Sequence, residues 1–331
     1  MTIIHRSHLI FDIGQFKLVQ TLAIHDLQSA TPFQDKEYRT AGNKRQILLF
    51  DGEYVPETRK NLQLLLEKSD IEGIIGHFVT MFLGDLSNKH KVIGCQLNGL
   101  YGCYACFGFK SLPEAPNKPV GNKFEDARWQ YGPLKTFSDC ERINQDFLKE
   151  CEELGLDPDS AAGQSLLSGK YYNHRNSPLF MAPNPNDKIQ DWFPIDGLHT
   201  VPLGCVQDCL KSLEKEFPKE MKRVFTKTNM RNELSNQPGG QWAGSQIKDF
   251  WTEKNLSFLE RKVSHKHQGK LLVNYLRKTK SLYHMMVQKE LNRETFRTVI
   301  QDWRDSFDAC FYFRSPNRLL SETEKIHHLY R

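Results

Sequence analysis

Residues 73–106, GIIGHFVTMFLGDLSNKHKVIGCQLNGLYGCYAC, decide the predicted fold. The apolar run from Ile74 to Leu83 is rich in β-branched and aromatic residues, which is typical of a buried strand. The run breaks at Gly84 and leaves Asp85 at the carboxyl end of that strand. A carboxylate in this position is suited to a hard divalent cation, which prefers oxygen ligands. The stretch therefore predicts a sheet that carries a metal-binding acid.

A C-x-x-C turn closes the same stretch and indicates a second kind of metal site. Leu86, Val92 and Ile93 are spaced so that a short helix can cover the sheet, and the turn then brings Cys103 and Cys106 together. Such a turn supplies half of the ligands of a tetrahedral zinc ion. The chain has eight cysteines and no recognisable secretory signal at its start, which favours reduced thiols and metal ligation over disulfides.

The composition limits the class of protein. Hydrophobic residues make up 39% and charged residues 26% of the 331 positions, which is typical of a soluble globular protein with one large core or two smaller ones. No apolar stretch approaches the roughly 20 residues of a membrane span, so we expect no membrane partner. The net charge of +5 is mild, and it permits a nucleic-acid partner without requiring one.

The N-terminal residues predict the beginning of the sheet. Residues 8–27 are interpreted as two strands, because an apolar run leads into Asp12 and Gly14 marks a turn before the return strand. Residues 44–55 predict a third strand, and Pro56 stands where a helix can begin. The side chains that this helix turns toward the core are Leu62, Leu65 and Leu66.

The later part of the chain predicts helices. Residues 110–136 are rich in proline, glycine, asparagine and lysine, and are interpreted as a linker out of the sheet, after which no strand is expected. Ser138 and Glu141 have the spacing of a capping box, which predicts a helix that runs to about Leu154.

Two residue pairs in the next helical region have more than one interpretation. Asp196 and His199 form a D-x-x-H pair, which either caps the following helix or contributes to a site. Cys205 and Cys209 are one helical turn apart and could bind a metal, although small buried cysteines on a core face are the favoured interpretation.

A basic segment covers residues 254–280. Glu260 is its only acid, and His265 and His267 lie among the cations. Such a segment can follow the phosphates of a nucleic acid, and a solvated helix face is the alternative. The cations that we expect to contact nucleic acid are Arg261, Lys262, Lys266, Lys270, Arg277, Lys278 and Lys280.

The succession of strand, Gly-Asp, helix and C-x-x-C resembles the second catalytic acid and zinc knuckle of eukaryotic DDE transposases. This group includes the CACTA, hAT and Transib types and the recombinase of antigen-receptor genes. The pattern of an animal branch of transposon-derived proteins is similar to blocks that occur here in the same order: FDIGQFKL, VPETRKNLQLLL, GDL, YGCYAC, DGLHTVPLG and GGQWAGSQI.

The resemblance implies an α/β fold in which an RNase H-like mixed sheet, a partial core over residues 1–110, precedes a large all-α insertion over 111–331. It implies that Asp12 and Asp85 are catalytic acids on neighbouring strands and share Mg²⁺ or Mn²⁺. Two such ions can stabilise the attacking and leaving oxygens of a phosphoryl transfer. Asp51 also ends a strand and is a rival for the first acid, but it lies in a D-G turn, a common structural use.

The resemblance also implies a structural Zn²⁺ and a DNA partner in the nucleus, and it allows a homo-oligomer. His327 in SETEKIHHLYR is similar to the first of two histidines that complete the zinc site, with His328 or water as a fourth ligand. His265 and His267 are the reserve ligands. The second family histidine and the third carboxylate, a glutamate, are expected beyond Arg331, so we expect a chain that binds DNA but does not cut it alone.

Two alternatives remain open at this point. The chain could be a domesticated nucleic-acid-binding or scaffold protein that keeps the fold without cleavage. It could also be a zinc-stabilised nuclease that takes its third carboxylate from Glu322 or Glu324.

Overall fold

The structure is a computed structural model of the chain. Before residue 54 it describes the backbone alone. The residues that it describes are 5–14, 17–26, 46–53, 58–71, 73, 75, 79–83, 86–97, 100–120, 124, 126–194, 200–228, 230, 242, 244–287, 292–313, 319–320, 322 and 324–329.

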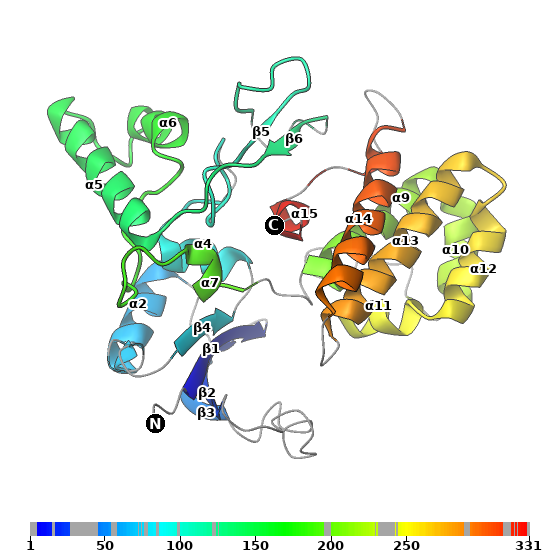
Figure 1. The fold of residues 1–331 in the computed structure, drawn as a ribbon, viewed down its shortest axis with the longest axis horizontal. Coiled ribbons are helices and arrows are strands. Elements are labelled where there is room, and N and C mark those ends of the chain that lie inside the picture. The colour runs from blue at the N-terminus through cyan, green and yellow to red at the C-terminus, as the bar shows by residue number, and fades with distance from the viewer. Residues whose placement is uncertain are drawn as a thin grey trace. The chain divides into compact units, whose positions relative to one another are not determined.

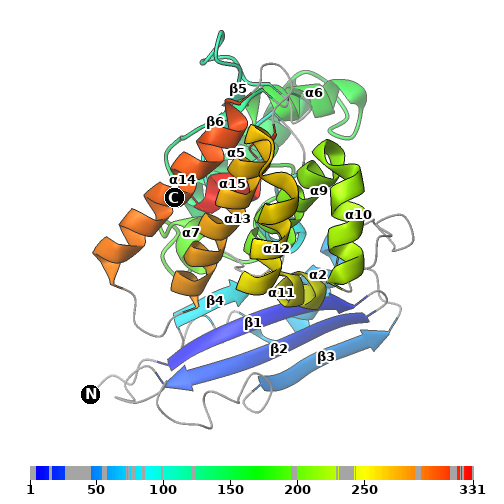
Figure 2. The same cartoon turned by 90° about the vertical axis from the view of Figure 1, so that its right-hand side faces the viewer.

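A four-stranded mixed sheet forms the N-terminal part, as the sequence predicted for residues 8–27 and 44–55. Its strands are β1 (His5–Gly14), β2 (Lys17–Asp26), β3 (Gln46–Glu53) and β4 (Val79–Leu83), in the order β3-β2-β1-β4 (Figure 2). β1 and β2 are antiparallel, with Gly14 opposite Lys17, so only two residues connect these strands. β2 and β3 are also antiparallel, whereas β1 and β4 are parallel.

The strand predicted from Ile74 is shorter than expected. Ile71, Gly73 and Ile75 have helical backbone, and β4 begins only at Val79. Ile71 and Ile75 are four residues apart and both are buried, which is the spacing of one helix face. A continuous apolar run does not distinguish a buried helix from a buried strand, and this explains the error.

Two short helices pack beside the sheet. The helix α2 (Arg59–Lys68) begins at Thr58, whose hydroxyl accepts a hydrogen bond from the amide of Asn61 at 3.2 Å, and not at Pro56. Its predicted leucine stripe is buried. The helix α4 (Leu86–Ile93) packs against α2 and buries Val92 and Ile93.

The chain is divided into two compact units. The first contains residues 1–122 and 129–196, and the second contains residues 123–128 and 197–331. The expected boundary after residue 110 does not coincide with this division. The reason is that Phe82 of β4 stacks on Phe180 with ring centroids 4.3 Å apart, so residues well beyond 110 complete the core of the sheet.

The segment 110–136 is not simply a linker. Together with Phe109 it forms a two-stranded sheet of β5 (Phe109–Ser111) and β6 (Arg128–Gln130), so the interpretation of this segment as a linker alone was wrong. Both strands have three residues, which is too short for an alternating pattern to be recognised. The other helices of the first unit are α5 (Phe137–Glu153), α6 (Ala161–Lys170) and α7 (Ile189–Trp192).

From residue 200 onward, the elements that the structure describes in the second unit are all helical. Trp303, Tyr275 and Phe307 are fully buried in its core, where α13 (His267–Met286) packs against α14 (Arg293–Phe311) (Figure 1). None of the described helices combines the length and hydropathy that a membrane span requires. The elements of this unit are η1 (Val201–Val206, a π-helical segment), α9 (Gln207–Glu216), α10 (Pro218–Lys227), α11 (Gly244–Phe250), α12 (Glu253–Val263), α13 (His267–Met286), α14 (Arg293–Phe311) and α15 (Glu324–Leu329).

Candidate metal centre

The C-x-x-C turn is held by backbone hydrogen bonds to the strand-like segment 133–135. The amide of Phe107 donates to the carbonyl of Pro133 at 3.0 Å, and the amide of Lys135 donates to that of Ala105 at 2.9 Å. A Cβ on Gly132 would lie 2.5 Å from the carbonyl carbon of Phe107, so only glycine allows this close approach. Backbone contacts with residues 132–135 therefore hold the turn in place without a metal.

The two thiols of the turn are buried and one is already in a hydrogen bond suited to a thiolate. The exposed fraction is 0% for Cys103 and 1% for Cys106. The amide of Gly108 donates to Sγ of Cys106 at 3.2 Å. A hydrogen bond to sulfur favours its charged form, which is the form that binds metals.

A buried lysine lies against the same turn. Lys135 has no exposed surface, and its Nζ donates to the carbonyl of Cys103 at 2.8 Å. The ammonium also lies 5.6 Å from the ring centre of Phe107 and 5.8 Å from that of Tyr172. These carbonyl and ring-face contacts offset part of the cost of burying the charge.

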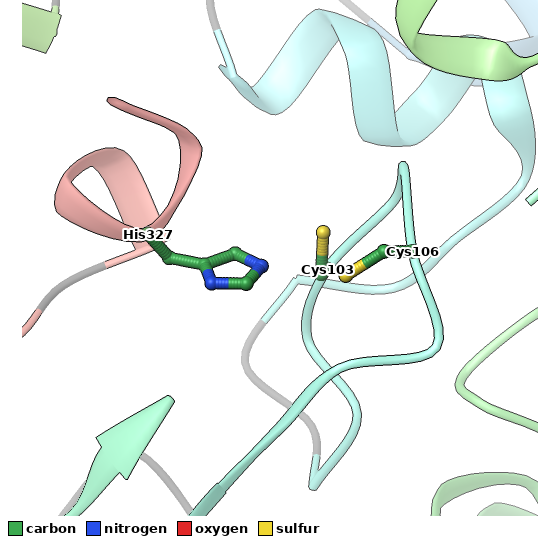
Figure 3. A group of neighbouring side chains, drawn as sticks. All are labelled: Cys103, Cys106 and His327. Atoms are coloured by element: carbon green, nitrogen blue, oxygen red, sulfur yellow. The ribbon is translucent and has the colours of Figure 1, made fainter. Parts of the chain in front are cut away.

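His327 of α15 completes a three-residue group with the turn. One ligand atom of each of Cys103, Cys106 and His327 lies within 4.8 Å of the other two, and all three residues are buried. Figure 3 shows the imidazole directed toward the two sulfur atoms. The predicted association of His327 with the C-x-x-C turn is therefore present.

The donors of this group suit zinc. Two sulfurs and one imidazole nitrogen are soft to borderline ligands, which are typical of structural zinc and not of Mg²⁺ or Mn²⁺. The group can thus bind a metal such as zinc. A closed structural site takes four ligands, and the side chain of His328, the predicted alternative, lies outside the described residues. The reserve ligands His265 and His267 are exposed and are not members of the group.

Of the two predicted catalytic acids, Asp12 lies within the described residues and Asp85 does not. Asp12 lies in β1 opposite Val19 of β2, and the rival Asp51 lies in β3, also opposite Val19. Asp85 lies outside the described residues, as do Asp196 and His199.

The cysteine pair of the second unit behaves as the favoured interpretation predicted. Cys205 and Cys209 are both buried, and Cys209 donates its S–H to the carbonyl of Leu272 at 3.4 Å. Burial, followed by the charges of Cys310 and Asp208, raises the pKa of the Cys209 thiol well above its ordinary value. A thiol kept protonated in this way is a poor metal ligand.

The basic segment is partly neutralised by acids from outside it. Arg277 pairs with Glu253 and Glu260, Lys278 pairs with Asp302 at 2.6 Å, and Lys280 lies 3.8 Å from Glu253. Of these acids, only Glu260 belongs to residues 254–280. The composition of the segment alone therefore overestimated its net positive charge. The predicted cations that are exposed are Arg261, Lys266 and Lys270.

No protein-family model matches this sequence, and no curated protein matches it.

Sequence reasoning missed a second group of metal-binding residue types. Sγ of Cys95 lies 3.1 Å from Nε2 of His174, and Sγ of Cys140 lies 3.8 Å from the same nitrogen. These residues come from three segments without a shared motif. The only local signal is the H-x-x-x-x-C spacing from His90 to Cys95.

Sequence reasoning also missed the role of Arg128. Its guanidinium donates to the carboxylates of Glu322 at 2.7 Å and Asp308 at 2.8 Å, and lies 4.7 Å from the ring centre of Phe311. Burial lowers the pKa of Arg128, but the charges of Glu322 and Asp308 outweigh this and raise it overall. Glu322, considered above as a third catalytic carboxylate, is thus engaged by a cation.

Proposed function

We propose that this chain is a transposase-derived DNA-binding protein with an RNase H-like core. In this proposal Asp12 and Asp85 bind Mg²⁺ or Mn²⁺, and Cys103, Cys106 and His327 bind a structural zinc ion. The proposal includes a nuclear location, because its partner is DNA. A domesticated protein that binds nucleic acid without cleavage is the alternative, and the experiments below distinguish the two.

The strand order carries the proposal. The resemblance requires antiparallel first strands with Asp12 inside the first, and it requires the strand before Asp85 to lie next to that strand. β1 contains Asp12, is antiparallel to β2 and is the parallel neighbour of β4. The β1–β4 register ends with Ile10 opposite Leu83, and each aspartate follows two residues later in the sequence. The arrangement supports the assignment of the two acids to one sheet edge.

The exposed cations Arg261, Lys266 and Lys270 support DNA binding. They belong to α12, α13 and the turn between these helices. None of the three has a carboxylate partner among the ion pairs identified in the described residues, in contrast to Arg277 and Lys278. Phosphate contacts by such cations contribute affinity without reading sequence.

The direct test is DNA affinity as a function of salt. Fluorescence anisotropy of a random-sequence duplex is measured for the wild-type chain and for the variant R261Q/K266Q/K270Q. Each phosphate contact that is lost lowers the slope of log affinity against log salt by about 1. We expect weak, salt-sensitive binding and a slope reduced by about 2–3 in the variant.

A control variant of equal charge separates a specific patch from net charge. Lys60, Lys118 and Lys188 are exposed and belong to the other unit. The variant K60Q/K118Q/K188Q removes the same three charges and should keep most of the affinity. An equal loss of DNA affinity in the two triple variants would contradict the assignment of phosphate contacts to Arg261, Lys266 and Lys270. The absence of DNA binding by the wild type would overturn the proposed function.

Cleavage distinguishes the enzyme from the non-catalytic alternative. Nicking of supercoiled plasmid with Mn²⁺ is compared for the wild type and for Asp12→Ala and Asp85→Ala. Nicking that disappears in both variants supports catalysis by these acids. DNA binding without nicking is the result that we expect of this chain alone, and nicking that survives both substitutions would contradict the assignment of the acids.

A further inference from the structure

Helix α10 of the second unit presents a row of cations to solvent. Lys219, Arg223 and Lys227 follow one another at intervals of four residues, so they lie on one face of the helix. All three are exposed, and the apolar residues of the helix are buried. The rise of about 1.5 Å per residue spaces the charges by ~6 Å along the helix axis. Glu220 is the only acid in α10.

This row is unfavourable for the helix itself. Like charges four residues apart repel each other on a helix surface. None of the three cations has a carboxylate partner among the ion pairs of the described residues, whereas Arg277 and Lys278 on α13 both have one. Ion pairing within the described part of the unit therefore leaves the row uncompensated. A negatively charged partner would remove the repulsion.

Contacts at both ends of α10 join this row to the cations of α12. At the start of α10, Nζ of Lys266 lies 5.5 Å from the ring centre of Phe217, the residue before the helix. At its end, Nζ of Lys227 lies 4.4 Å from the ring centre of Phe258 on α12. The two helices pack against each other, and these contacts show that they run antiparallel (Figure 1). Their cations therefore border one surface, the α10–α12 surface, which comprises Lys219, Arg223, Lys227, Arg261, Lys262 and Lys266.

Phe258 gathers three of these cations. Besides Lys227, Nζ of Lys262 lies 5.5 Å from its ring centre and Cζ of Arg261 lies 6.0 Å from it. An aromatic ring face attracts cations and so helps to position them. The ring carries no net charge and cannot neutralise them, and no hydrogen bond of the three is found among the described residues. Their N–H groups are therefore free to donate to phosphate oxygens.

The side chains around the row favour a polyanion over a membrane or a protein partner. A helix that binds a membrane or a protein groove uses exposed apolar side chains. On α10 the apolar Met221, Val224 and Phe225 are buried within the unit. The exposed positions between the cations are Lys222 and Thr226, which are polar. Such a surface is suited to a chain of phosphates.

We propose that the α10–α12 surface binds the phosphate backbone of DNA. This inference rests on the proposed function, because it takes DNA as the partner. It extends that function by assigning the contact to α10, a helix outside the basic segment of residues 254–280. Because phosphates carry no sequence information, the surface contributes affinity that is independent of base sequence.

The dependence of DNA affinity on salt tests the assignment. Fluorescence anisotropy of a random-sequence duplex is measured for the wild type and for K219Q/R223Q/K227Q. The control K60Q/K118Q/K188Q removes the same number of charges from exposed positions of the other unit. Each lost phosphate contact lowers the slope of log affinity against log salt by about 1, so the α10 variant should lose about 2–3 and the control less than about 1. Equal losses in the two variants would overturn the assignment, because net charge alone would explain them.

The melting temperature without DNA controls for folding. The substituted side chains are exposed, and glutamine has a helix propensity similar to that of lysine and arginine. Removing like charges relieves their repulsion, so the melting temperature of K219Q/R223Q/K227Q should equal or exceed that of the wild type. A clearly lower value would show that these cations stabilise the fold, and would overturn their assignment to DNA.

The failure of this inference is distinguishable from the failure of the proposed function. DNA affinity that falls in R261Q/K266Q/K270Q but not in K219Q/R223Q/K227Q would overturn the role of α10 and leave the proposed function intact. The absence of DNA binding by the wild type would overturn both. Tighter binding to vesicles that contain phosphatidylserine than to DNA, lost in the α10 variant, would assign the surface to a membrane and overturn the inference.

Discussion

Nε of Arg128 donates a hydrogen bond to the carboxylate of Glu322 at 2.7 Å, across 194 residues of sequence. The carboxylate is 1% exposed and the guanidinium 15%, so both charges are largely removed from water. Asp308 and the ring of Phe311 complete the surroundings of this cation. Glu322 therefore has a structural partner in the second unit, which argues against its use as a ligand of a catalytic metal.

We expect Arg128→Met to lower the free energy of unfolding by about 3–5 kcal/mol, because it leaves a buried carboxylate without its cation. The double variant Arg128→Met/Glu322→Leu should recover much of this loss. Urea denaturation followed by circular dichroism measures both values. Arg142→Met is the control, since the guanidinium of Arg142 is 63% exposed and its ion pairs should contribute only about 0–1 kcal/mol. Equal losses in the single and double variants would contradict the prediction.

The capping box of α5 should contribute a stability that depends on pH. Thr136 and Asp139 exchange hydrogen bonds, with both the amide and the hydroxyl of Thr136 donating to the Asp139 carboxylate at 3.0 and 2.8 Å. Burial acts to raise the pKa of Asp139, but these hydrogen bonds and Arg142 outweigh it and lower the pKa overall. The contribution is therefore present above the unfolded pKa, about 3.9, and is lost as the pH falls through the folded value.

Thr136→Ala should cost about 1 kcal/mol at neutral pH. Asp139→Asn should reduce the dependence of unfolding free energy on pH between about 5 and 2, measured by urea titrations at several pH values. Ser138→Ala is the matched control, because the cap, Thr136 with Asp139, lies two residues earlier than the predicted Ser138–Glu141 pair. A larger effect at Ser138 would be evidence against this cap.

Gly94→Ala should be strongly destabilising. The new Cβ would meet the carbonyl of Asn176, and the positive φ adds a strain of about 1–2 kcal/mol. We expect a total loss above about 2 kcal/mol in the melting of the first unit. Gly169→Ala provides a contrast within the same unit: Gly169 is helical and its Cβ would meet nothing within 4 Å. This control should be stabilising by about 0.5–1 kcal/mol, and a loss as large as that of Gly94→Ala would refute the steric argument.

Removing the C-x-x-C thiols should remove zinc and lower the melting temperature. A ligand at about 1,000 times its Kd stabilises the folded state by about 4 kcal/mol, so the variant Cys103→Ser/Cys106→Ser should lose a shift of this order on zinc addition. Differential scanning calorimetry with and without a chelator measures it. Cys205→Ala is the control, because Cys205 is buried outside the group. An unchanged zinc response in the double variant would exclude the site.

Local patterns in the sequence were sufficient for several elements. The first three strands, the leucine stripe of α2 and the C-x-x-C turn were all predicted, because each depends on residues within one short segment. Side-chain periodicity, turn residues and ligand spacing are properties of such segments. Ile71 and Ile75 show the limit of this approach, since their helical backbone cannot be distinguished from a strand by hydropathy alone.

Tertiary structure alone decided which distant residues meet. Cys95 and His174 are 79 residues apart, and Arg128 and Glu322 are 194 apart, so no spacing rule connects either pair. The charges of the basic segment are another case, because Glu253 and Asp302, which neutralise part of it, lie outside the segment. By itself the sequence determined the local elements and the residue types available for metal binding. Their partners were decided by packing, because burial of apolar surface brings segments together without regard to their separation along the chain.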